Sequence, residues 1–209
     1  MKNKPFAQSK TRSVSGTLNR AARVLTADMD AESFNYTVYR GDCITFTAMS
    51  DNPLKLQIPS LDVDTSIPFP SDIPYIKMNN TGKIEITLSG KPGIINVIDF
   101  SDSSYHETNA MGADAFIKNI KPLILDVRRK EEYDSSHIEN SMLIPVQSLS
   151  DELDKLAKYK NENILIYCAA GNRSTVASKI LIDAGFTNIH NMRYGIGEWI
   201  QKELPVVNE

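Results

Sequence analysis

The stretch that decides the fold of the C-terminal half begins with four apolar residues and continues into a polar loop. It reads Ile164-Leu165-Ile166-Tyr167-Cys168-Ala169-Ala170-Gly171-Asn172-Arg173-Ser174. The apolar run is typical of a strand that is buried on both faces of a parallel sheet. Residues 174–184 then favour a helix that Gly185 ends. The sequence therefore predicts a cysteine between a buried strand and the start of a helix.

This position predicts chemistry for the cysteine. The first N–H groups of a helix have no partner within the helix, and they attract anions. Small residues at 169–171 allow the loop to turn its N–H groups toward the sulfur, and Arg173 adds a cation. We expect Cys168 to be ionised at neutral pH and to act as a nucleophile. The candidate binding loop consists of Ala169, Ala170, Gly171, Asn172, Arg173 and Ser174.

The residues around this stretch alternate between strand and helix patterns. Residues 123–127 form a second apolar run, and the leucines at 149, 153 and 156 suit an amphipathic helix. A further helix with Trp199 is expected at 197–204. Such alternation is typical of an α/β domain with a mainly parallel sheet, which we place at residues 112–209.

Several motifs of this half, in this order, resemble the rhodanese family. They are Leu123-Ile124-Leu125-Asp126-Val127-Arg128, Glu132-Tyr133, His137-Ile138, the Cys-x-x-Gly-x-Arg loop at Cys168, and Asn191-Met192 with Gly195-Ile196 and Trp199. The resemblance covers about residues 112–205. It implies a sulfurtransferase in which Cys168 takes a sulfane sulfur from a thiosulfate-like donor. A persulfide on Cys168 then passes that sulfur to cyanide or a thiol, without metal or organic cofactor.

Four further residues of these motifs are expected to support the loop. We assign structural roles to Asp126, Arg128, Glu132 and His137, with an ion pair between Arg128 and Glu132 as one arrangement. His137 is expected to hold a turn, since a thiolate mechanism needs no imidazole base. The family's usual turn residues are replaced at Ser136, Glu139, Asn140 and Tyr194, outside the loop.

Two other functions remain open for the same loop. Cysteine-dependent phosphatases have five residues between cysteine and arginine, whereas four separate Cys168 from Arg173. The shorter loop encloses a smaller space, which suits one sulfur atom better than a phosphate. A rhodanese fold that binds a partner or senses sulfur without turnover is the main alternative. The other cysteine, Cys43, is expected to pack in the core or on a sheet face.

The N-terminal half has short runs of period two separated by turn formers, which predicts a β-sandwich at residues 24–100. It resembles the cupredoxin fold in Ala27-Asp28-Met29, Phe34-Asn35-Tyr36, Gly41-Asp42, Ile58-Pro59 and Pro92-Gly93. Leu54 and Asp99 stand where that family has a histidine and a cysteine, so we expect no copper site. We expect the sandwich to dock a protein partner or to shape access to Cys168.

The composition narrows the classes of protein to which the chain can belong. Of 209 residues, 41% are apolar and 23% are charged, which suits a globular protein of one or two domains. No apolar run approaches about 18 residues, so membrane insertion is not expected. The net charge of −3 argues against a nucleic-acid binder.

The segments on either side of the predicted sandwich are expected to have no regular structure. Residues 1–23 are basic and free of acids, and we expect a flexible tail there, with an organelle-targeting peptide as the alternative. Residues 101–111 are expected to be a linker. The protein is expected in the cytoplasm, with export left open.

Overall fold

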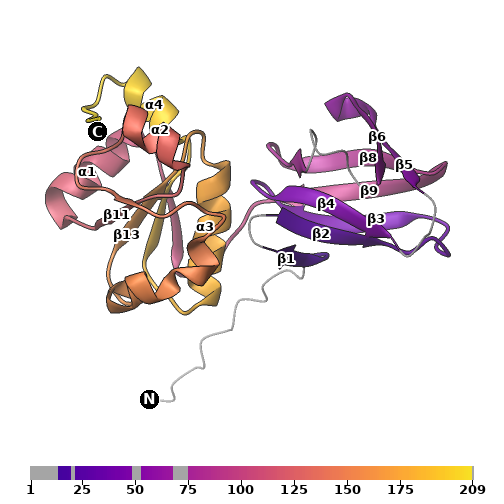
Figure 1. Cartoon of the computed structure of the whole chain (residues 1–209), viewed down its shortest axis with the longest axis horizontal. Helices are drawn as coiled ribbons and strands as arrows, with labels where there is room; N and C mark the ends of the chain where they lie inside the picture. The colour runs from indigo at the N-terminus through magenta and orange to yellow at the C-terminus, as the bar shows by residue number, and fades with distance from the viewer. Residues whose placement is uncertain (1–13, 20–21, 49–52, 68–74, 209) are drawn as a thin grey trace, which may run out of the picture.

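The computed structural model describes residues 14–19, 22–48, 53–67 and 75–208. The chain forms an all-β half and an α/β half, which lie side by side (Figure 1). Among the described residues, the longest helices are too short and too polar to cross a bilayer.

The all-β half contains two sheets. One has the order β1-β2-β4-β7 and the other has the order β3-β9-β8-β5-β6. The strands of the first sheet are β1 (Thr17–Asn19), β2 (Ala22–Ala27), β4 (Cys43–Ala48) and β7 (Ile76–Lys77). Those of the second are β3 (Phe34–Tyr39), β5 (Leu54–Ile58), β6 (Val63–Ile67), β8 (Gly82–Leu88) and β9 (Lys91–Ile98), and the short helix η1 (Pro59–Leu61) joins β5 to β6.

The core of this half lies between the two sheets. Alternate side chains of the strands point inward, as Leu54, Leu56 and Ile58 of β5 show, and all three are buried. Period-two runs of apolar residues, such as Phe34 to Val38 and Ile84 to Leu88, form strands as expected, and they belong to β3 and β8. Both sheets are mixed, because β2 pairs parallel to β4 and β3 pairs parallel to β9. The resemblance to cupredoxins stays a prediction.

Two expected connecting segments contain strands. The tail expected at 1–23 includes β1 and the start of β2, where Arg23 is 2% exposed and forms an ion pair with Asp42. Its positive charge is therefore buried and neutralised, which a count of charges does not reveal. Residues 1–13 lie outside the described residues. The linker expected at 101–111 is also wrong in part, since β10 (Tyr105–Thr108) pairs parallel to β14 through its backbone.

The α/β half has one parallel sheet with the order β10-β14-β13-β11-β12. Its further strands are β11 (Leu123–Asp126), β12 (Met142–Leu143), β13 (Ile164–Tyr167) and β14 (Ile189–Met192). Its helices are α1 (Ala110–Ile120), α2 (Lys130–Ser135), α3 (Asn172–Asp183) and α4 (Gly195–Gln201). The amphipathic helix expected at the leucines forms as two short 3₁₀ segments, η2 (Leu149–Asp151) and η3 (Leu153–Tyr159).

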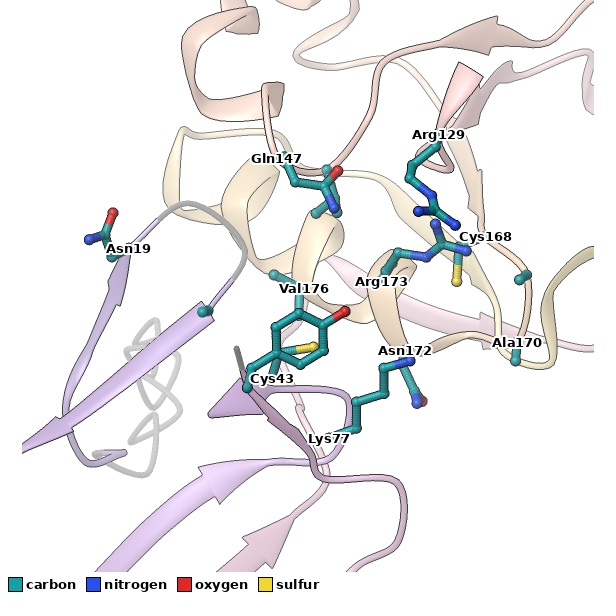
Figure 2. Close-up of a pocket in the computed structure, with 14 residues that line it drawn as sticks. Asn19, Cys43, Lys77, Arg129, Gln147, Cys168, Ala170, Asn172, Arg173 and Val176 are labelled. Atoms are coloured by element: carbon teal, nitrogen blue, oxygen red, sulfur yellow. The ribbon is translucent and has the colours of Figure 1, made fainter. Parts of the chain in front are cut away.

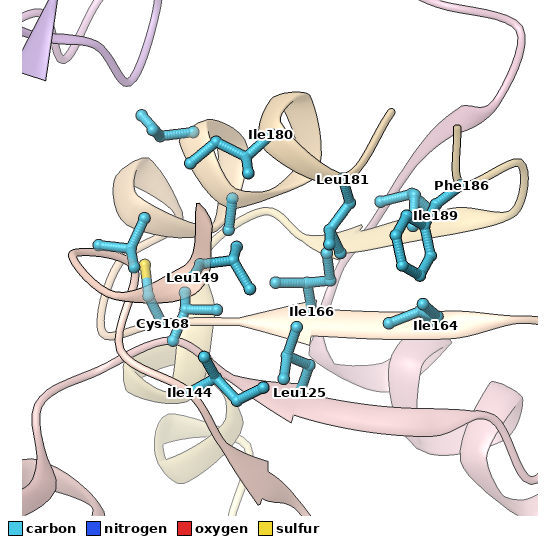
Figure 3. Packing of buried hydrophobic residues seen from close by; sticks show 14 of the residues in the cluster. Leu125, Ile144, Leu149, Ile164, Ile166, Cys168, Ile180, Leu181, Phe186 and Ile189 are labelled. Carbon is cyan, nitrogen blue, oxygen red and sulfur yellow. The ribbon is translucent and has the colours of Figure 1, made fainter. Parts of the chain in front are cut away.

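Both faces of the parallel sheet are covered, as the continuous apolar runs predict. Leu125, Ile164 and Ile166 pack on one face with side chains of α3 (Figure 3). Ile124 and Leu165 pack on the opposite face with α1 and α4. This burial fixes β13, and β13 carries Cys168 at its carboxyl end.

Aromatic side chains join the two halves. Phe100 follows the last strand of the sandwich, and its ring makes edge contacts with Tyr39 and Tyr105 at centroid distances of 5.1 and 5.0 Å. All three belong to the core cluster of the α/β half. Arg40 also forms an ion pair of 2.6 Å with Asp99. The sandwich is therefore packed against the sheet that carries Cys168.

Candidate active site

Cys168 lies in a tight turn between β13 and α3. Gly171 ends the turn with a φ of +91°, and α3 begins at the next residue. The backbone N–H of Gly171 donates a hydrogen bond of 3.1 Å to the Cys168 Sγ. The turn therefore directs a backbone donor at the sulfur, at the end of α3 where N–H groups lack helical partners.

The start of α4 holds the other side of the turn. The N–H groups of Ile196 and Gly197 donate to the carbonyls of Cys168 and Ala169 at 2.8 and 3.1 Å. Gly195 is required here, because a Cβ at this position would lie 2.3 Å from the Cys168 carbonyl oxygen. These bonds occupy the carbonyl oxygens of the turn on the side away from the sulfur.

Cys168 lines a cavity of about 710 Å³ that lies between the two halves (Figure 2). Cys168 is only 1% exposed and belongs to the core cluster of the α/β half, so little of its surface faces the cavity. The cavity is lined by residues of both halves: Asn19, Ala22, Cys43, Tyr75 and Lys77 from the sandwich, and Arg129, Val146, Gln147, Cys168, Ala169, Ala170, Asn172, Arg173 and Val176 from the α/β half.

Arg173 is held beside the sulfur by a carboxylate. Its guanidinium makes two hydrogen bonds with Glu132, of 2.6 and 2.7 Å. These bonds hold the pKa of Glu132 at about 2, well below its usual value. Arg129 approaches the same carboxylate at 3.4 Å. The expected pair of Arg128 with Glu132 is wrong, because Arg128 is occupied by Asp126.

Of the predicted loop residues, Ala169, Ala170, Asn172 and Arg173 line the cavity with Cys168, and two do not. Gly171 does not line the cavity, but its N–H donates a hydrogen bond to the Cys168 sulfur. Ser174 is fully buried, and its hydroxyl donates to the Gly171 carbonyl at 3.0 Å. Asn172 also forms a hydrogen bond with Asn79 of the sandwich, so the loop contacts both halves.

The remaining predicted residues lie around the loop rather than in the cavity. Asp126 and Arg128 form a buried ion pair of 2.6 Å, and Arg128 also donates to the Ser136 carbonyl at 2.6 Å. His137 is buried, stacks on Tyr133 at 3.7 Å, and donates from Nδ1 to the Tyr133 carbonyl at 2.9 Å. His137 thus holds the turn after α2 by contacts with Tyr133, and neither it nor the Asp126–Arg128 pair lines the cavity.

Sequence reasoning missed the part of the cavity that comes from the sandwich. Cys43 does lie on a sheet face, but that face forms a cavity wall. Burial raises the pKa of the Cys43 thiol to about 11, so it is protonated near neutral pH. Lys77 and Tyr75 follow a stretch without a strand pattern, and no local signal connects them with a cysteine about ninety residues later. Within the described ranges, no three His, Cys, Asp or Glu side chains gather as a metal site would require.

A buried strand, a tight cysteine turn and a helix N-terminus together define a class of α/β domain with a cysteine at the start of a helix. The model of the rhodanese-like domain family matches residues 111–202. These residues form a rhodanese-like domain, as the motifs predict.

Curated relatives match part of the chain. A tRNA uridine(34) hydroxylase of Hamiltonella defensa is 31% identical over 109 residues, which is 48% of this chain and 29% of the relative. A tRNA uridine(34) hydroxylase of Photorhabdus laumondii is 32% identical over 98 residues, 43% of this chain and 28% of the relative. The chain thus matches less than a third of the length of either relative.

Solved structures are also similar to part of the chain. A rhodanese-related protein of Thermoplasma volcanium is 35% identical, with a TM-score of 0.41, over 50% of this chain and 100% of that one. A thiosulfate sulfurtransferase of Pseudomonas aeruginosa is 24% identical, with a TM-score of 0.45, over 50% of this chain and 20% of that one.

Proposed function

We propose that the protein is a sulfurtransferase that carries a sulfane sulfur as a persulfide on Cys168. The Cys168 thiolate attacks the outer sulfur of a thiosulfate-like donor, the sulfur–sulfur bond of the donor breaks, and sulfite leaves with the bonding electron pair. The terminal sulfur of the resulting persulfide is then attacked by cyanide or a thiolate. No net oxidation occurs, so neither half-reaction needs a metal or organic cofactor.

One observation carries this proposal: the Gly171 N–H donates to the Cys168 sulfur at the N-terminus of α3. A persulfide places its negative charge one atom further out, and preformed donors stabilise such a charge without reorganising. Arg173 and Arg129 line the cavity beside the sulfur and attract an anionic donor. The arrangement suits sulfur transfer better than phosphate transfer, because the turn is one residue shorter than a phosphate loop.

The relatives favour a second candidate function, which is action on tRNA. Both relatives described above are named tRNA uridine(34) hydroxylases. The match covers 29% and 28% of these two relatives, so the matched part of the chain would correspond to only part of such an enzyme. Binding of tRNA to the protein at physiological salt, measured by fluorescence anisotropy, tests this role. Micromolar or tighter binding would support it.

Intact mass after incubation with thiosulfate tests the main proposal. We expect the protein to gain one sulfur atom, which dithiothreitol removes, and the Cys168→Ser variant to gain none. Cys43→Ser is the matched control and should gain the sulfur as the unmodified protein does. A protein that gains no sulfur from thiosulfate or from an organic persulfide is instead a binding or sensing module, and the proposal is then wrong.

A further inference from the structure

The cavity wall opposite Cys168 is built by one row of side chains across the sandwich sheet. Ala22 of β2 is paired with Cys43 of β4, and Cys43 is paired with Lys77 of β7. Paired residues on neighbouring strands project from the same face of a sheet. All three line the cavity, so the row faces the cysteine loop (Figure 2).

This row presents one fixed charge. Cys43 is neutral near pH 7 and Ala22 is apolar, which leaves the Lys77 ammonium. Among the described residues, no carboxylate lies within ion-pair distance of Lys77. Its ammonium lies over the Tyr75 ring, at 5.9 Å from the ring centroid. Arg173, by contrast, already makes two bonds with Glu132. Lys77 is therefore the cation of the cavity that most lacks an anionic partner.

The cavity as a whole is suited to an anion larger than an inorganic sulfur donor. Its described lining contains three basic residues, Lys77, Arg129 and Arg173, and no acidic ones. A volume of about 710 Å³ is in the range of sites for drug-sized molecules. Thiosulfate, an ion the size of sulfate, does not fill such a space.

We propose that Lys77 is a specificity-determining residue, which binds the carboxylate end of an organic thiol or persulfide while the sulfur end reacts at Cys168. The inference rests on the proposed function. In the donor direction, the Cys168 thiolate attacks the outer sulfur of R–S–SH. The sulfur–sulfur bond breaks, R–S⁻ leaves, and the proton stays on the new Cys168 persulfide. In the acceptor direction, the thiolate of an R–SH molecule takes that sulfur back.

The test compares two thiols of equal length as sulfur acceptors, mercaptohexanoate and mercaptohexanol. We expect the unmodified protein to have a lower KM for the acid. Lys77→Gln should raise the KM for the acid about fivefold and remove its advantage over the alcohol. Lys77→Arg should keep the advantage. Lys83→Gln, which removes an exposed lysine of β8 outside the cavity, is the matched control and should change neither KM.

The inference is wrong if Lys77→Gln leaves the preference for the acid intact, or if it raises the KM for the acid and for the alcohol equally. A separate measurement keeps this result distinct from a failure of the proposed function. The S-methyl thioether of mercaptohexanoate is titrated into the Cys168→Ser protein by calorimetry, which needs no sulfur transfer. Binding that Lys77→Gln weakens about fivefold supports the inference. The inference is overturned if Lys77→Gln leaves the affinity unchanged, or if the thioether does not bind, even when the persulfide forms on the unmodified protein.

Discussion

A carboxylate outside the cavity controls the position of the loop arginine. Glu132 lies at the start of α2, and its two oxygens each accept a hydrogen bond from Arg173. Bidentate pairs of this kind fix the direction of a guanidinium as well as its distance. Glu132 is thus a positioning residue, and its effect on the sulfur passes through Arg173.

We expect Glu132→Gln to lower the free energy of unfolding by about 1 kcal/mol at neutral pH. The pKa of Glu132 is lowered from 4.5 to about 2 in the folded protein. Its stabilisation is therefore complete above pH 4.5 and is lost as the pH falls toward 2. The difference in Tm between the two proteins should follow this course. Glu139→Gln is the control for an exposed carboxylate, and a difference that does not change with pH would contradict the assignment.

At the scale of elements, the site depends on the junction of β13 with α3. Gly171 turns the chain there with a positive φ, and a Cβ at this position would lie 1.6 Å from the Arg193 carbonyl oxygen. The junction therefore leaves no space for a side chain, and it packs directly on the segment that leads into α4.

Gly171→Ala should cost at least about 3 kcal/mol in the free energy of unfolding, measured in urea, because the clash adds to the strain of the backbone. Gly185→Ala is a matched control. Its φ is +89°, but the nearest atom to an added Cβ is the Lys160 Nζ at 3.9 Å. It should cost about 1 kcal/mol, for the backbone strain alone. Equal costs at the two glycines would show that the close approach to Arg193 has no effect.

At the scale of the whole molecule, the aromatic contact at Phe100 keeps the two cavity walls together. Phe100 is 8% exposed and touches a tyrosine from each half. We expect Phe100→Ala to cost about 3 kcal/mol and to split the thermal unfolding transition into two, as seen by calorimetry. The Ile94→Ala control removes an apolar side chain that is 37% exposed and should leave one transition. One unchanged transition in Phe100→Ala would mean that other contacts hold the halves together.

The sequence by itself determined the α/β half and its cysteine turn. Those features are local: β13, the turn and α3 are consecutive in the chain, and their apolar runs, small residues and helix-stopping glycine act over a few positions. The bond from Gly171 to Cys168 spans three residues. Strand patterns of the sandwich were likewise readable, because period two is a property of each strand alone.

Tertiary structure alone decided which distant residues share the cavity. Cys43 and Lys77 meet through the register of β4 with β7, and both face the cavity that Cys168 lines because the sandwich packs on the α/β half. The ion pairs of Glu132 with Arg173 and of Arg23 with Asp42 also join separate elements. Such pairings depend on how the two halves and their sheets are arranged in space. Burial and charge partners between separate elements follow from that arrangement and leave no periodic pattern in the chain.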